Sequence, residues 1–123
     1  MAGDANTRYG MDEVMEKRMD EREFNALANA TLRRIEDAIE SCGADIDLEV
    51  MAGGVLEVEF ADGSKMVINR HTAAREIWVA ARSGGYHFRP EGGRWVGTRD
   101  GEELMVALSR CLSDQAGEEV RLD

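Results

Sequence analysis

The chain has 123 residues, of which 43% are hydrophobic and 33% charged, a composition typical of one globular domain rather than of a disordered or fibrous protein. No apolar run approaches the about 20 residues that a membrane-spanning helix needs, and two cysteines are too few for a disulfide-built secreted domain. The net charge of −10 argues against a nucleic-acid partner, because phosphates would be repelled.

Residues 1–18 show neither a helical nor a strand period, and they begin with small and polar residues. We therefore expect them to form a flexible N-terminal extension. They contain no apolar segment of the kind found in secretory signals. The folded domain is expected to occupy residues 19–123.

A first helix is predicted over residues 20–42, where apolar residues recur every three or four positions. Asp20 and Glu23 match a capping box at its start, and a glycine follows its end at position 43. Three acidic residues lie near the end of the helix and off its apolar stripe: Glu36, Asp37 and Glu40. Acid is unfavourable there, because the carbonyl end of the helix dipole is already negative. This mismatch indicates a functional role.

Alternating apolar and polar residues then predict six short strands separated by glycine-containing turns. The strands are expected at 45–50, 55–60, 65–70, 76–82, 86–89 and 94–98. A second helix follows, with Asp100 and Glu103 as its capping residues and Gly117 at its end. Each strand has one apolar face. We therefore predict an α+β fold, a two-layer α/β sandwich in which an antiparallel six-stranded sheet carries the N- and C-terminal helices on one face.

The acidic residues are concentrated in one part of the chain, since residues 35–64 contain nine of them and no lysine or arginine. We define the acidic ridge as the six carboxylates from the end of the first helix to the first strand: Glu36, Asp37, Glu40, Asp45, Asp47 and Glu49. Carboxylate oxygens suit hard cations such as Mg, Ca, Mn and iron, and an open row of them predicts weak binding. The same row could instead dock on a basic protein surface or be an ordinary solvated face.

The fourth strand allows two orientations for Trp78. If Ile77 and Val79 point inward, Trp78 lies on the open face of the sheet as a candidate hot spot for a protein partner; in the opposite phase it belongs to the core. His71 and His87 are isolated from other ligand residues in the sequence, and we expect both to be structural. The sequence contains no P-loop, GxSxG, HExxH or CxxC motif, so it does not support catalysis.

Eight segments in order resemble the bacterial frataxin (CyaY) family between residues 23 and about 120: IEDAIE, DIDLE, GGVLEVEF, DGSKMVINR, EIWVAA, GGYHF, TRDGEEL and QAGEEV. The resemblance implies a frataxin-like α-β6-α fold and a non-catalytic, cytoplasmic protein of iron–sulfur cluster assembly. It implies weak binding of Fe(II) and Fe(III) on the acidic ridge, with other hard cations also accepted. It also implies docking on the cysteine desulfurase, the cluster scaffold protein as a second partner, and a monomer that could oligomerise with iron.

The same resemblance assigns partner contacts on the sheet. Trp78 matches the family's sheet-surface tryptophan and Asn69 its neighbour on the preceding strand. We add Glu57 and Glu59 on the second strand as partner-binding candidates. Ser41 stands where relatives often have another acid, which leaves the iron stoichiometry open. Two alternatives also stay open: a pure protein-interaction regulator of the desulfurase with incidental metal binding, and an enzyme that oxidises ferrous iron at the ridge.

Overall fold

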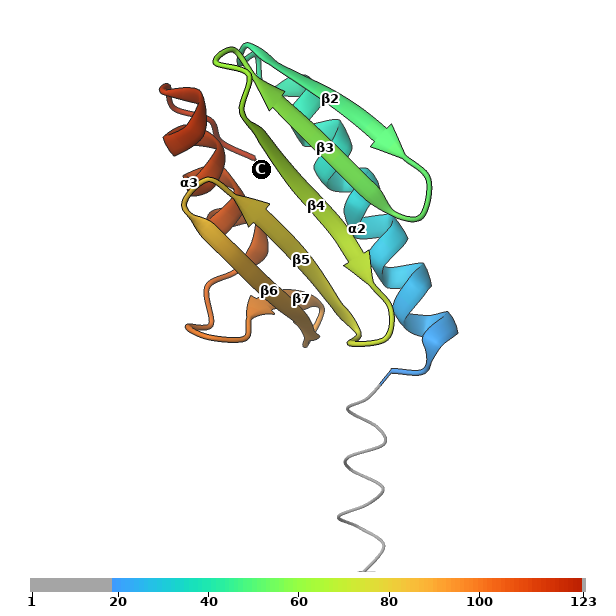
Figure 1. Cartoon of the computed structure of the whole chain (residues 1–123). Helices are drawn as coiled ribbons and strands as arrows, with labels where there is room; N and C mark the ends of the chain where they lie inside the picture. Colours follow the sequence, from blue (N-terminus) through green and yellow to red (C-terminus); the bar gives the residue numbers. More distant parts are fainter. Residues whose placement is uncertain (1–18, 123) are drawn as a thin grey trace, which may run out of the picture.

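The computed structural model describes residues 19–122, so the extension expected at residues 1–18 lies outside the described part of the chain. The elements are α2 (Glu21–Ser41), β2 (Ile46–Met51), β3 (Val55–Phe60), β4 (Lys65–His71), β5 (Glu76–Ala81), β6 (Gly84–Glu91), β7 (Arg94–Gly97) and α3 (Leu104–Ala116). All neighbouring strands are antiparallel, and their order in the sheet is their order along the chain. Both helices lie on one side of this sheet (Figure 1), which confirms the predicted sandwich.

The first helix begins and ends as predicted. The backbone N–H of Glu23 donates to Asp20 Oδ1 at 2.8 Å, and the N–H of Asp20 donates to Glu23 Oε1 at 3.3 Å, so the capping box is complete. Cys42 caps the other end, and Gly43 follows with a φ of 79°, a left-handed conformation that favours glycine.

The start of the second helix differs from the prediction. Glu103 is the N-cap, and its carboxylate accepts hydrogen bonds from the N–H groups of Met105 at 3.1 Å and Val106 at 3.2 Å. Asp100 instead accepts from the N–H of Glu102 at 3.0 Å, within a turn where Gly101 has a φ of 76°. This positive φ is incompatible with a helix at that point, so α3 begins later than the Asp100 and Glu103 pair indicated.

The core lies between the helices and the sheet. Alternate residues of the central strands are buried, and so are the apolar stripes of α2 and α3. The rings of Phe24 and Trp95 meet edge to face with centroids 5.9 Å apart, and the indole N–H of Trp95 donates to Thr31 Oγ1 at 2.8 Å. This aromatic pair connects α2 to β7. Cys111 is buried in the core, as its position on the apolar stripe predicted. Within residues 19–122, no helix is long and apolar enough to cross a membrane.

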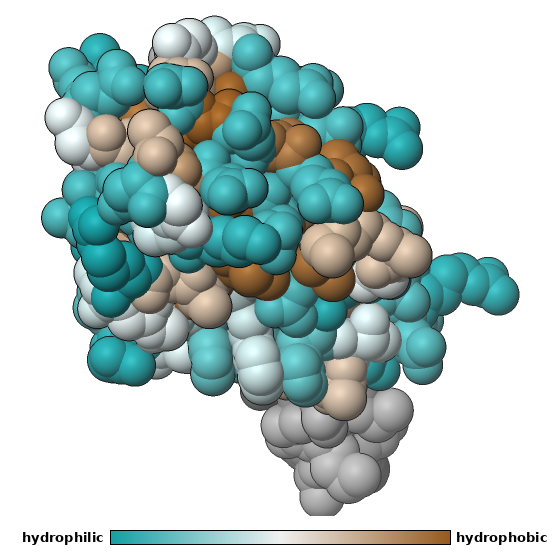
Figure 2. Space-filling view, turned by 45° about the horizontal axis from the view of Figure 1, so that its top comes forward, coloured by the Kyte–Doolittle hydropathy of each residue, from teal (hydrophilic) through white to brown (hydrophobic). Residues whose placement is uncertain are grey.

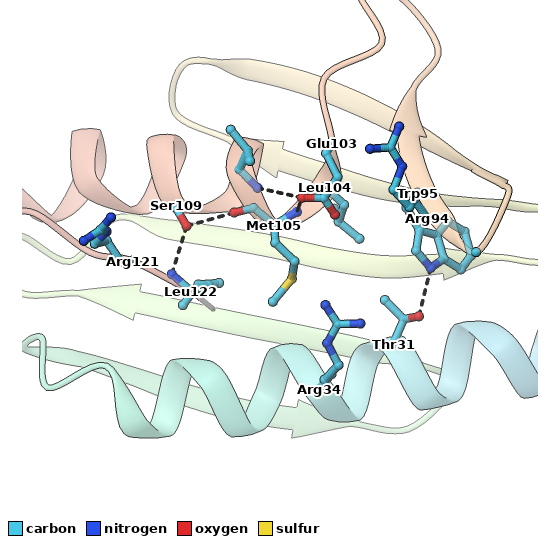
Figure 3. Close-up of a pocket in the computed structure, with 12 residues that line it drawn as sticks. Thr31, Arg34, Arg94, Trp95, Glu103, Leu104, Met105, Ser109, Arg121 and Leu122 are labelled. Carbon is cyan, nitrogen blue, oxygen red and sulfur yellow. Dashed lines mark hydrogen bonds between the residues drawn. The ribbon is translucent and has the colours of Figure 1, made fainter.

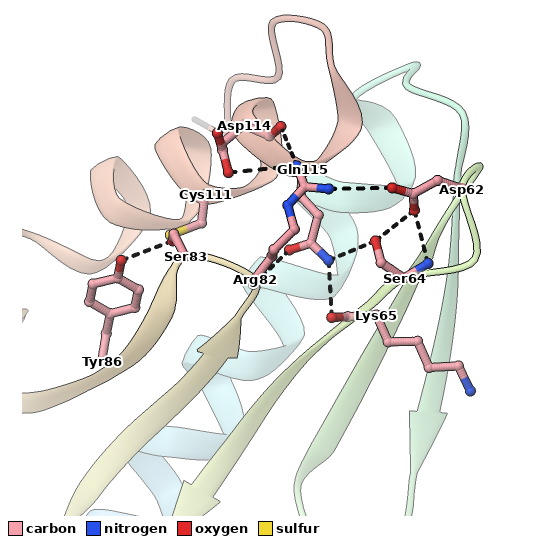
Figure 4. A network of polar contacts seen from close by, with 9 residues as sticks. All are labelled: Asp62, Ser64, Lys65, Arg82, Ser83, Tyr86, Cys111, Asp114 and Gln115. Atoms are coloured by element: carbon pink, nitrogen blue, oxygen red, sulfur yellow. Dashed lines mark hydrogen bonds and ion pairs between the residues drawn. The ribbon is translucent and has the colours of Figure 1, made fainter.

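A buried glutamine connects the end of α3 to the sheet by hydrogen bonds (Figure 4). The side-chain amide of Gln115 donates to Ser64 Oγ at 2.9 Å and to the carbonyl of Lys65 at 3.1 Å, while its Oε1 accepts from the N–H of Arg82 at 3.1 Å. Asp62 extends this network. Hydrogen bonds from the hydroxyl and the backbone N–H of Ser64, together with the nearby charge of Arg82, hold the pKa of Asp62 below its usual value.

We expect Gln115→Leu to lower the free energy of unfolding by about 1–3 kcal/mol, because the substitution leaves the N–H of Arg82 and the carbonyl of Lys65 without their partner. Urea denaturation measures the change. Glu118→Gln, at an exposed position just after α3, is the control and should leave the unfolding free energy unchanged. A Gln115→Leu midpoint equal to that of the control would contradict the role assigned to this network.

Candidate functional site

The register of the β2–β3 hairpin places acidic residues directly opposite one another. Asp47 pairs with Glu59, and Glu49 pairs with Glu57. Opposite residues of an antiparallel pair share one face, with Cβ atoms about 4.5–5.5 Å apart. Val58, between the two glutamates, is fully buried, so all four carboxylates lie on the open face, away from the helices. We name these two rows the acidic pairs.

One basic residue, Lys65 on β4, contacts the acidic pairs. Lys65 Nζ lies 3.5 Å from Glu57 Oε1, and Lys65 is the register partner of Glu59 on the β4 side. Within residues 19–122 this is the one ion pair that involves these four carboxylates. Lys65 therefore partly neutralises the negative charge of the acidic pairs on the β4 side. On the side of the edge strand β2, no basic residue of the described chain forms an ion pair with them.

The helical members of the acidic ridge lie on two flanks of α2. Glu36 lines a shallow hollow with Val50 and Met51, so it faces the β2–β3 hairpin. Glu40 lies one turn further along the same face of the helix. Asp37 lines a different hollow together with Arg121, on the flank toward the C-terminal segment. Five of the six predicted ridge residues thus follow the β2 edge, because Asp45 is exposed immediately before β2, and Asp37 lies apart from them.

The carboxylates of β2 and β3 lie opposite each other in pairs along this edge of the sheet. Within residues 19–122, no three His, Cys, Asp or Glu side chains are grouped so that they could hold one metal ion. Glu57 and Glu59 were predicted to contact a partner, and the register makes them direct neighbours of the ridge residues Asp47 and Glu49. The turn at Gly53–Gly54 was the signal that could have found this arrangement, since pairing outward from the turn aligns 49 with 57 and 47 with 59.

Trp78 lies on the open face of the sheet, as the first of the two orientations predicted, because Ile77 and Val79 are buried. Its indole lies between two imidazoles, with ring centroids 3.7 Å from His71 and 4.2 Å from His87 and interplanar angles of 16° and 8°. We name these three rings the aromatic stack. Sequence reasoning treated the two histidines as isolated, since their meeting depends on the register of β4, β5 and β6.

Polar contacts fix the orientation of the aromatic stack. The indole N–H of Trp78 donates to Glu76 Oε1 at 2.7 Å, and His87 Nδ1 lies 3.6 Å from the same oxygen. Asn69 is the register partner of Trp78 on β4, and its amide donates to the carbonyl of Arg70 at 3.3 Å. The acidic pairs and the aromatic stack therefore share one sheet face. Figure 2, an oblique view of the molecule, shows hydrophilic residues with hydrophobic ones exposed between them.

The sequence of this chain is similar to those of known proteins over most of its length. Residues 17–118 match the family model described as a frataxin-like domain. The chain is 59% identical over 104 residues to the iron–sulfur cluster assembly protein CyaY of Dechloromonas aromatica, a match that covers 85% of this chain and 99% of that protein. It is 43% identical over 104 residues to the CyaY protein of Neisseria meningitidis, covering 85% of this chain and 96% of the relative.

Solved structures agree with these matches. The frataxin of Psychromonas ingrahamii superposes with a TM-score of 0.78 at 32% identity, covering 85% of this chain and 99% of that one. A trimeric frataxin from the yeast Saccharomyces cerevisiae, complexed with ferrous iron, superposes with a TM-score of 0.59 at 26% identity, covering 87% of this chain and 98% of that one. The chain therefore belongs to the frataxin-like (CyaY) family, as the order of its sequence segments predicted.

Proposed function

We propose that this chain is an iron–sulfur cluster assembly protein that binds ferrous and ferric iron weakly at its acidic edge and docks on the cysteine desulfurase. The acidic edge consists of the acidic pairs together with Glu36, Glu40 and Asp45 along β2. The curated relatives of the chain carry the name of iron–sulfur cluster assembly proteins, and their family is non-enzymatic. The observation that carries the proposal is the register of β2 and β3, which opposes Asp47 to Glu59 and Glu49 to Glu57 on an open face. The proposal places this activity in the bacterial cytoplasm.

Iron is the cargo in this proposal, and the acidic pairs suit a loosely held cargo. Carboxylate oxygens are hard ligands, and each row presents only two carboxylate groups toward solvent, so a bound ion keeps several of its waters. Such a site releases its ion readily to a partner. A trimeric yeast frataxin complexed with ferrous iron supports the assignment of this cargo to the family.

The same face supports a docking role. An acidic edge attracts a basic surface on a partner, which speeds association and makes it sensitive to salt. Trp78 supplies a large, partly exposed ring next to Asn69, and aromatic residues of this kind are frequent hot spots. We assign the acidic edge to the desulfurase, and we assign the aromatic stack to contact with the desulfurase or the cluster scaffold protein.

One observation favours the alternative of a regulator that binds its partner without iron. The ammonium group of Lys65 already lies 3.5 Å from Glu57, so one row carries its own cation. If iron binding is incidental, the acidic pairs serve the partner alone. Metal titration of the acidic edge separates the two proposals.

We expect an anaerobic Fe(II) titration to broaden backbone amide signals of residues 36–49 and 57–59, and little else. The double variant Asp47→Asn/Glu49→Gln should weaken this effect several-fold, because it removes one carboxylate from each row. The control is Glu118→Gln/Glu119→Gln, which makes the same charge change at exposed positions after α3. If the wild-type signals of the acidic edge stay sharp, the iron-binding proposal is contradicted and the metal-free regulator is favoured.

The like charges that attract a cation also cost stability. We expect Asp47→Lys or Glu49→Lys to raise the free energy of unfolding by about 0.2–1 kcal/mol at low salt, since each converts a repelling cross-strand pair into an attracting one. Urea denaturation at several salt concentrations measures the gain, which should shrink as salt increases. Glu118→Lys is the control. If neither ridge variant gains more than this control, the opposed carboxylates do not repel each other appreciably.

We expect Trp78→Arg to weaken desulfurase binding about tenfold or more, a loss typical of a hot-spot residue, while the domain stays folded. Titration calorimetry measures the affinity, and circular dichroism checks the fold. Val106→Ala, at an exposed apolar position on α3, should bind like the wild type. Unchanged affinity in the folded Trp78→Arg variant would remove Trp78 from the interface, and loss of folding would mean that Trp78 belongs to the core.

A further inference from the structure

A groove runs between α2 and α3 (Figure 3). The two helices lie on one face of the sheet (Figure 1), and the acidic pairs lie on the other. The volume of the groove is about 680 Å³. Apolar side chains contribute to its walls: Trp95, Leu104, Met105 and Leu122. The volume falls within the range of small-molecule sites, which runs from roughly 300 to 1,000 Å³. We name this feature the interhelical groove.

Three arginines from separate elements line the interhelical groove. Arg34 belongs to α2, Arg94 to β7 and Arg121 to the C-terminal segment, and Figure 3 shows Arg34 reaching from α2 toward α3. In the part of the chain from 19 to 122, none of the three forms an ion pair, whereas Arg82, Arg89 and Arg110 do. A chain with a net charge of −10 thus has a locally basic hollow.

The other polar side chains of the groove already form hydrogen bonds within the protein. Glu103, the one acidic residue in its lining, accepts from two backbone N–H groups as the N-cap of α3. Thr31 Oγ1 accepts from Trp95, and the Ser109 hydroxyl donates to the carbonyl of Met105 and accepts from the N–H of Leu122. The guanidinium groups are therefore the donors left to meet a ligand, and they select for negative charge.

We propose that the interhelical groove binds a small organic anion that carries two or more carboxylate or phosphate groups. Guanidinium groups match both kinds of oxyanion with two parallel hydrogen bonds, and they do so better than lysine. Three of them on separate elements suit a ligand with several charges, and the apolar walls suit its carbon skeleton. This binding site goes beyond the proposed role in cluster assembly, since it lies in the helical layer and needs no iron.

The groove contains its own reporter. The chain has two tryptophans, so Trp78→Phe leaves Trp95 in the groove wall as the single source of indole fluorescence. We would titrate this metal-free protein at physiological salt with citrate as the polycarboxylate and with ATP as the polyphosphate. A saturable change in Trp95 emission with either probe is expected. The two probes distinguish the carboxylate from the phosphate source.

Arginine variants test where the anion binds. Arg34→Gln should weaken binding about tenfold, and Arg34→Lys should weaken it less, because lysine keeps the charge but loses the bidentate geometry. The matched control is Arg33→Gln, which makes the same change one residue away on α2, where Arg33 lines the hollow beside β2 and β3. Arg33→Gln should bind like the parent protein. Circular dichroism confirms that each variant is folded.

Three results would overturn the proposal. The first is that neither citrate nor ATP gives a saturable change. The second is that Arg33→Gln weakens binding as much as Arg34→Gln does, which would mean unspecific attraction to positive charge. The third is that a deca-glutamate peptide saturates the signal while both small anions fail, which would assign the groove to a protein segment. None of these results bears on iron at the acidic edge, so the two proposals fail separately.

Discussion

One-sided burial of the sheet is the constraint on which the rest of this structure depends. Leu56, Val58, Met66 and Ile68 point toward α2 and α3 and are buried, so the residues that alternate with them must face away from the core. Neither α2 nor α3 covers that open face (Figure 1). The hydrophobic effect therefore decides which side of each strand packs, and it leaves an open face on which strand register arranges the polar side chains.

The apolar pattern of the sequence was sufficient to predict the layers. Alternation in the strands and the three-to-four-residue stripe in the helices report burial directly, which is why the fold and the outward orientation of Trp78 were confirmed. The sequence signals for where a helix or strand begins were less reliable. Asp100 and Glu103 have the spacing of a capping box, yet Gly101 adopts a left-handed conformation between them and delays the helix. The first strand residues of β6, Gly84 and Gly85, have no side chains to show alternation.

The candidate site could be predicted only in part from the sequence, for a physical reason. The ridge residues are neighbours along the chain, so their charge is visible as a cluster in residues 35–64. Trp78, His71 and His87 come from three strands and meet only through register. The opposed carboxylates also meet through register, but the turn at Gly53–Gly54 marks that register in the sequence. The arginines of the interhelical groove are further apart still, and no local pattern marks them. Proximity created by tertiary packing leaves no trace in a single segment.

The order of the strands has a consequence for how the molecule assembles. Every strand pairs only with its neighbours in the chain, so each pair of adjacent strands forms by closing one short loop. The contact between Thr31 and Trp95, by contrast, joins α2, which precedes the six strands in the chain, to β7, the last of them. Low contact order speeds folding, and the wide separation of these two side chains opposes it. The packing of α2 against β7 should therefore be the slow step in the folding of this domain.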